Sequence, residues 1–373
     1  MYSGMWCLRW ARVGFKEGAW RQLGLLSGMV CVGSVVGAVA WTANMQSNAF
    51  YYAANVNGVT RQQQYTLYAA FFRFGAVFVT LYGLEFLCLI ISKLMLLGRL
   101  VTNNTQISQA DVTDMSGVRR RWLSARALSN VYRLMAGVVI VGSFVGTVAD
   151  AVAGAYAVQV AGLFNQAAAA CDAAGNDTNS SLALINATIV LNAESNTAAS
   201  VQASSEALTL LLVSIAFFVI VSWSVALFRM MERVATRSLL ANSDVRNMLA
   251  SEANSAKIVA DTMRFAADQR QRLTAACLVV LITFPARAAF DLLLAYSLFN
   301  DPLNPACGPC DPCQSTPILI NTWLHYTPEF RSIVVAVSSP LPLTLSLWLL
   351  TKAVARVRLI AADMERVRGG DGK

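Results

Sequence analysis

Four ionisable residues lie inside long apolar segments of this sequence, namely Glu85, Asp150, Arg287 and Asp291. An ionisable side chain at the centre of a membrane helix costs about 2.5–3.5 kcal/mol on insertion scales, so such a residue is a candidate functional site. Counted at about 1.5 Å per residue from the inner basic residues Arg99, Arg133 and Arg272, the four lie at depths of about 21–28 Å. We therefore predict that they share one layer and form an intramembrane polar network.

Arg287 is the only cation that we place deep in the membrane, and Asp291 lies one helical turn from it. We predict that Arg287 neutralises one or more of the three acids, because an unpaired buried charge costs far more than a paired one. Two interpretations follow. The network either fixes the order of the helices, or it lines a hydrated cavity or ion path.

Three prolines predict breaks in the membrane helices. Pro285 removes one backbone amide from a predicted span and so predicts a kink. Pro340 and Pro342 lie near the middle of the last predicted span. Breaks of this kind persist only against protein or a water-filled cavity, so we expect static kinks or part of a pathway.

Two sets of small residues predict close helix contacts. Gly142, Gly146 and Gly154 recur with Asp150 at intervals of four, which places all of them on one helix face. Glycine lets a second backbone approach closely, so we expect Asp150 to face protein rather than lipid. Gly33-x-x-x-Gly37 predicts a second such face.

The elements that carry these residues are predicted to be transmembrane helices. Of the 373 residues, 56% are hydrophobic and only 13% are charged, which excludes an ordinary soluble domain. Six segments are long enough to cross a hydrocarbon core of about 30 Å. They are residues 23–43, 66–97, 134–163, 207–230, 273–298 and 331–353. We predict an all-α polytopic membrane protein with helical extensions on both sides.

The positions of lysine and arginine predict the orientation. Residues 1–22, 93–133, 229–272 and 352–373 hold 25 of the 29 basic residues, and these segments all fall on one side of the six spans. Basic residues favour the cytosolic side, so both termini should be cytosolic. The net charge of +8 then needs no nucleic-acid partner and favours anionic lipids of the inner leaflet.

The segments outside the spans have different expected structures. Residues 1–22 are amphipathic and suit either a helix in the cytosolic interface or a simple flanking anchor. We expect a polar cytosolic loop at 98–131 and a basic cytosolic tail at 354–373. The extracellular loop 164–206 and the cytosolic hairpin 231–272 should continue the helices beside them. The arginines of the hairpin form either a lipid-facing surface or a docking site for protein.

Four cysteines are predicted to face outside, Cys171 in the loop 164–206 and Cys307, Cys310 and Cys313 in the loop 299–330. An even number on a face that can be oxidising predicts two disulfides, with three pairings open. Cys307-Gly-Pro-Cys310 also matches a redox motif, but it lies in a proline-rich loop without a βαβ unit. Zinc binding with His325 is a further alternative. We favour structural disulfides and expect no metal or cofactor.

Three N-x-[ST] sequons begin at Asn176, Asn179 and Asn186 in the same outer loop. A single sequon is weak evidence for glycosylation, but three beside an outer cysteine support one another. They place the chain in the plasma membrane or another membrane of the secretory pathway.

The sequence contains no Walker loop, G-x-S-x-G or H-E-x-x-H motif and only one histidine, so we expect no enzyme. No span repeats arginine at every third position, which excludes a voltage sensor. Two functions remain. The first is a structural, anchoring or receptor-like subunit of a membrane assembly, with protein partners or copies of itself. The second is an ion channel or transporter that uses the polar network and the proline-broken sixth span.

Overall fold

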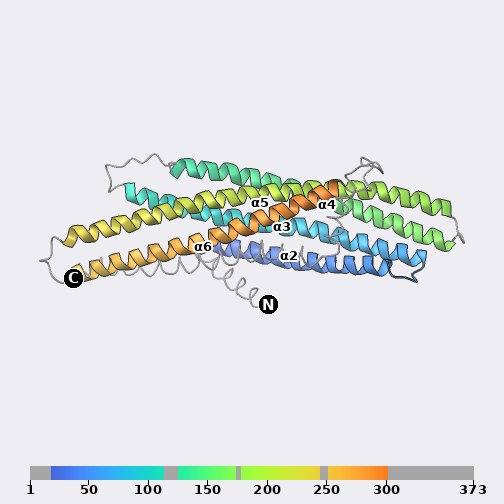
Figure 1. The fold of residues 1–373 in the computed structure, drawn as a ribbon, viewed down its shortest axis with the longest axis horizontal. Coiled ribbons are helices and arrows are strands. Elements are labelled where there is room, and N and C mark those ends of the chain that lie inside the picture. The colour runs from blue at the N-terminus through green and yellow to red at the C-terminus, as the bar shows by residue number, and fades with distance from the viewer. Residues whose placement is uncertain (1–17, 113–124, 174–177, 244–250, 301–373) are drawn as a thin grey trace. The chain divides into compact units, whose positions relative to one another are not determined.

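The computed structural model describes residues 18–112, 125–173, 178–243 and 251–300, and its elements in these ranges are all α-helices (Figure 1). The predicted interfacial segment 1–22 falls almost entirely outside the described residues. The sixth span at 331–353 and the tail 354–373 lie wholly outside them.

The described helices are long and apolar. In chain order they are α2 (Gly18–Ala54), α3 (Arg61–Val112), α4 (Ala125–Ala173), α5 (Thr178–Ser243) and α6 (Ser251–Phe299). Each contains a stretch that can cross a membrane, and the stretches are Gly24–Ala54, Arg61–Thr102, Ala127–Cys171, Ala183–Met230 and Ala266–Phe299. The described part of the chain is therefore all-helical, and its five candidate spans make this a multi-pass membrane protein, as the composition predicts.

The helices are longer than a bilayer requires. The 66 residues of α5 correspond to about 100 Å at about 1.5 Å per residue, against a hydrocarbon core of about 30 Å. Segments 164–206 and 231–272, which we expected to continue the neighbouring helices, fall within α4, α5 and α6. Only residues 174–177 and 244–250 of these segments lie outside the described part.

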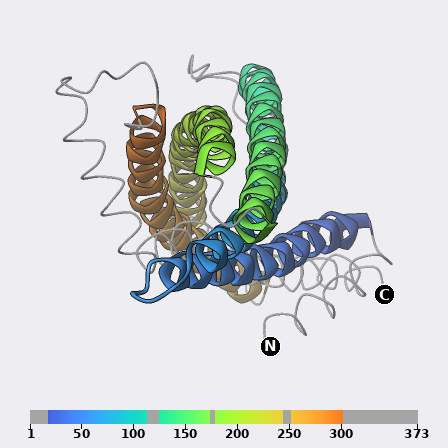
Figure 2. The ribbon, with the colours of Figure 1, turned by 90° about the vertical axis from the view of Figure 1, so that its right-hand side faces the viewer.

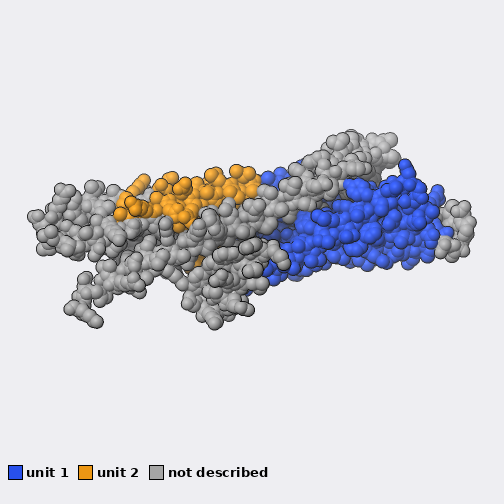
Figure 3. Space-filling view, turned by 90° about the horizontal axis from the view of Figure 1, so that it is seen from below, with its two compact units in different colours: residues 1–95, 136–212, 285–336 blue, residues 96–135, 213–284, 337–373 orange. Residues whose placement is uncertain are grey.

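The chain divides into two compact units (Figure 3). The first unit comprises residues 1–95, 136–212 and 285–336, and the second comprises 96–135, 213–284 and 337–373. In α6 the division falls at Pro285, although α6 is α-helical from Ser251 to Phe299.

Several hydroxyl side chains inside the apolar stretches form hydrogen bonds within their own helices. Ser34 donates a hydrogen bond to the Val30 carbonyl at 2.8 Å, and Ser143 donates to the Val139 carbonyl at the same distance. Because lipid offers no hydrogen-bond partners, this local bonding lets polar residues occupy a membrane helix at little cost.

A short turn joins α2 to α3 in the first unit, and Figure 2 views the helices from the end that carries it. Gly58 has φ +94°, a left-handed conformation that glycine adopts without strain. Thr60 and Gln63 form a reciprocal capping box: the Gln63 amide donates to Thr60 Oγ1 at 3.3 Å, and the Thr60 amide donates to Gln63 Oε1 at 3.2 Å. These contacts fix where α3 begins.

Glycines bring α2 and α3 into close contact. A Cβ atom placed on Gly33 would lie 3.2 Å from Cys88 Cβ, and one placed on Gly37 would lie 2.5 Å from the Glu85 carboxyl carbon. The contact is completed by Trp41, whose ring lies 5.4 Å from that of Phe78. The Gly33-x-x-x-Gly37 pattern thus corresponds to a helix interface.

The glycine ladder of α4 contacts two helices. On one side Ser205 of α5 donates to the Gly142 carbonyl at 2.6 Å, and its Oγ lies 3.5 Å from a Cβ placed on Gly146. On the other side Asp150 and Gly154 meet α3, where a Cβ on Gly154 would lie 2.6 Å from Thr80 Oγ1. The ladder therefore packs α4 between α3 and α5.

The second unit has its own contacts. A Cβ atom on Gly98 of α3 would lie 2.5 Å from the Tyr132 hydroxyl of α4. On α6 the half-exposed Arg272 and Asp268 form an i,i+4 ion pair at 2.9 Å.

We predict that Gly154→Leu destabilises the protein by about 1–3 kcal/mol, the usual cost of overpacking. The new side chain would collide with Thr80 and with the Ala76 carbonyl, which lies 3.3 Å from the Cβ position. Gly162→Leu on the same helix is the matched control, because a Cβ there has nothing within 4 Å. Thermal unfolding in detergent measures both, and equal melting temperatures for the two variants would contradict the packing described here.

Candidate functional site

Six buried ionisable side chains of the first unit define the buried charge cluster. Four are acids and two are bases, and none of the six is more than 6% exposed. They are Glu85, Lys93, Asp150, Glu206, Arg287 and Asp291. They come from α3, α4, α5 and α6, so the cluster involves every described helix of this unit except α2.

Arg287 of α6 is the centre of the cluster. Its Nη2 donates to the Tyr82 hydroxyl of α3 at 2.5 Å and to Glu206 Oε1 of α5. Its Nε lies 3.7 Å from Asp291 Oδ2, one turn further along α6. One guanidinium therefore connects three helices.

Aromatic rings enclose the same guanidinium. The Arg287 Cζ lies 5.8 Å from the centre of the Tyr82 ring and 5.9 Å from that of Phe86. Both rings stand on α3 and present their faces to the cation, an arrangement that stabilises a desolvated arginine.

Glu206 is well supplied with hydrogen-bond donors. Its Oε1 accepts from Arg287 and from the Tyr82 hydroxyl, the latter at 3.2 Å. Its Oε2 accepts from Gln202 Nε2 at 2.9 Å, one turn earlier on α5. Charge-assisted bonds of this kind stabilise the ionised carboxylate, so Arg287 and Glu206 form a buried ion pair.

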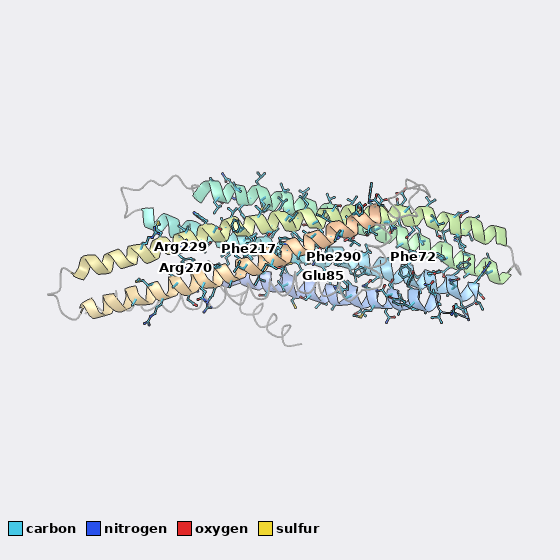
Figure 4. The ribbon with its side chains drawn as sticks, in the orientation of Figure 1. Phe72, Glu85, Phe217, Arg229, Arg270 and Phe290 are labelled. Atoms are coloured by element: carbon cyan, nitrogen blue, oxygen red, sulfur yellow. The ribbon has the colours of Figure 1, made fainter. Side chains whose placement is uncertain are left out.

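Glu85 lies near the middle of α3 (Figure 4), and its surroundings are different. Its carboxyl group packs against Gly37 of α2. Its Oε2 is enclosed, and no described residue donates a hydrogen bond to it. Arg287, Glu206 and Lys93 act on Glu85 through their charges.

Asp150 and Lys93 complete the cluster. The Asp150 carboxyl lies against the backbone of α3, where a Cβ atom on Gly83 would be 2.5 Å from its Oδ2. Lys93 is 3% exposed and lies eight residues beyond Glu85 on α3. Glu85, Glu206 and Asp291 all act on it electrostatically.

The sequence analysis did not predict Glu206 and Lys93 as members of the cluster. It also did not predict Tyr82, whose hydroxyl bonds to both Arg287 and Glu206. It counted Glu206 with the outer loop and Lys93 with the inner basic segment. Two signals were present. Gln202 lies one turn from Glu206 in a candidate span that begins at Ala183, and Lys93 has apolar residues on both sides.

The four residues predicted as a network are all buried in this unit, and among them Arg287 contacts Asp291 at 3.7 Å. The ion pair with Glu206 was not foreseen. Pro285 begins the part of α6 that carries Arg287. Pro340 and Pro342 lie outside the described residues.

The predicted outer sites are described only in part. Cys171 is half-buried near the end of α4 and forms no disulfide with any described residue. Asn186 is exposed on α5, which also contains Asn179. The remaining predicted residues, Asn176, Cys307, Cys310 and Cys313, lie outside the described part.

Within the described ranges, no group of three or more His, Cys, Asp or Glu side chains could hold a metal ion. Comparisons with protein-family models, with curated proteins and with solved structures find no match for this chain.

We predict that Arg287→Met lowers the free energy of unfolding by about 3–5 kcal/mol, because it leaves Glu206 as an uncompensated buried charge. The control is Arg272→Met, which breaks the half-exposed pair with Asp268 and should cost no more than about 0.5 kcal/mol. Denaturation in detergent with a fluorescence readout measures both changes.

A second substitution, made in the Arg287→Met variant, identifies the acid that pairs with Arg287. Glu206→Gln should recover part of the stability lost in Arg287→Met, because the double variant no longer buries an unpaired charge. Recovery by Asp150→Asn instead, with none from Glu206→Gln, would contradict the ion pair described here.

Proposed function

We propose that this chain is a non-enzymatic, multi-pass protein of the plasma membrane or another secretory-pathway membrane. It acts as a structural, anchoring or receptor-like subunit of a membrane assembly, with protein partners or copies of itself.

The observation that carries this proposal is the ion pair of Arg287 and Glu206. Arg287 is 2% exposed, and its contacts come from α3, α5 and α6. A pair that is desolvated, hydrogen-bonded and enclosed by aromatic rings holds three helices in one arrangement. Such rigidity suits a support or an anchor.

The proposed topology has six spans, the last at 331–353, and both termini in the cytosol. It rests on the distribution of basic residues. An aromatic group near the turn between α2 and α3 supports an interfacial position for that turn, because aromatic residues gather at membrane surfaces. Its members include Phe72 and Phe164, whose rings stack at 5.6 Å.

The outer side is proposed to carry the glycans and the disulfides. Asn186 is exposed, as an acceptor must be. The cytosolic side would meet anionic lipids through its arginines and lysines.

An ion channel or transporter is the second candidate, and the composition of the buried charge cluster favours it. The cluster contains four buried acids and only two buried bases. Excess intramembrane acid is typical of sites that carry protons or cations.

The topology predicts that protease added to intact cells spares epitope tags at Met1 and Lys373, because both ends are cytosolic. Permeabilised cells are the control, in which both tags should be lost. Loss of either tag in intact cells would overturn the six-span arrangement.

A measurement of ion flux distinguishes the structural subunit from the channel or transporter. The purified protein reconstituted into liposomes should pass protons and alkali cations no faster than protein-free liposomes, because the paired charges leave no conducting path. A flux that Glu85→Gln or Arg287→Met abolishes would replace the structural proposal with the transport one.

A further inference from the structure

We propose that Glu85 is a proton-binding site within the membrane and that its carboxyl group is protonated in the folded protein at neutral pH. This inference does not depend on the proposed function, since it concerns only whether the Glu85 carboxyl carries a proton.

The first argument is the contrast between Glu85 and Glu206, two acids of the same cluster. Three donors reach Glu206, from Arg287, Tyr82 and Gln202. Glu85 is 6% exposed, yet no described residue donates a hydrogen bond to its Oε2. A buried carboxylate loses its hydration, and no described hydrogen bond replaces that hydration at Oε2, which favours the neutral acid.

The second argument is the charge balance. With every group ionised, the four acids and two bases of the cluster would leave an excess of negative charge in a low-dielectric environment. Arg287 already bonds to Glu206 and lies near Asp291. Protonation of Glu85 removes one negative charge from the cluster and breaks no described hydrogen bond to its Oε2.

The third argument is the set of groups that face Glu85. From α2 it meets Gly37, which has no charge. Its own helix supplies Cys88 and Lys93, α5 supplies Glu206, and α6 supplies Arg287.

These groups oppose one another. Glu206 repels a second negative charge, while the attraction of Arg287 is shared with its bonded partner. On α4, Asp150 is a further buried acid of this unit, and its carboxyl lies against Gly83. Lys93 attracts the ionised form as Arg287 does, so burial without a described donor at Oε2 is what favours the neutral acid.

A proton fits this site better than a metal ion. A cation such as Na⁺ or Ca²⁺ needs several oxygen ligands around it. The described residues contain no such group of acids, and Gly37 packs against the Glu85 carboxyl. A proton needs only the carboxyl oxygen itself.

The test compares infrared spectra of the full-length protein in lipid nanodiscs at neutral pH. A protonated carboxylic acid has a C=O stretch that is separate from the carboxylate bands. That band should be present in the wild type and should lose intensity in Glu85→Gln. Glu194→Gln is the matched control, because Glu194 is exposed on α5 and lies outside the buried charge cluster.

Thermal unfolding provides a second readout. Glutamine has the shape and neutrality of protonated glutamate, so Glu85→Gln should keep the wild-type melting temperature, whereas Glu206→Gln should lower it. An unchanged acid band in Glu85→Gln would overturn the proposal. A loss of stability in Glu85→Gln as large as that in Glu206→Gln would also overturn it, because it would show that the wild type needs the charge.

Discussion

A guanidinium group enclosed within a membrane protein must be neutralised where it stands, because neither water nor lipid can do so. In this chain the group is Arg287, and its neutralisation requires Glu206 of α5 and the Tyr82 hydroxyl of α3 at fixed positions. The desolvated ion pair is thus the constraint on which the arrangement of α3, α5 and α6 depends.

Small residues allow the helices of the first unit to pack closely enough for these contacts to form. Helices in lipid gain no hydrophobic driving force from association, so close backbone approach and short polar bonds stabilise their contacts. Gly37 and Gly83 of α2 and α3 leave room for the carboxyl groups of Glu85 and Asp150. Ser200 of α5 adds a 3.0 Å hydrogen bond to the Ala295 carbonyl of α6. The buried acids are therefore held in spaces that any larger residue would fill.

The sequence was sufficient to predict the helical class and the long apolar helices of the described part. Glu85, Asp150, Arg287 and Asp291, which it places within these helices, are all buried. These predictions depend on local hydrophobicity, which a window of residues reports. It was not sufficient for the partner of Arg287. Glu206 follows a stretch rich in alanine, serine and asparagine, so the span predicted from hydropathy begins only at residue 207, whereas α5 already begins at Thr178. Which residue of another helix contacts Arg287 depends on how the helices pack together, and a local window of sequence carries no information on that packing.

The order of the helices along the chain has a consequence for biogenesis. Synthesis proceeds from the N-terminus, so α3, α4 and α5 leave the ribosome before α6. Glu85, Asp150 and Glu206 are therefore translated before Arg287, the cation that pairs with Glu206. Until α6 has been made, Glu206 of α5 lacks the cation with which it pairs. The arrangement of α3 and α5 around this ion pair can therefore be completed only after the last described helix has been synthesised.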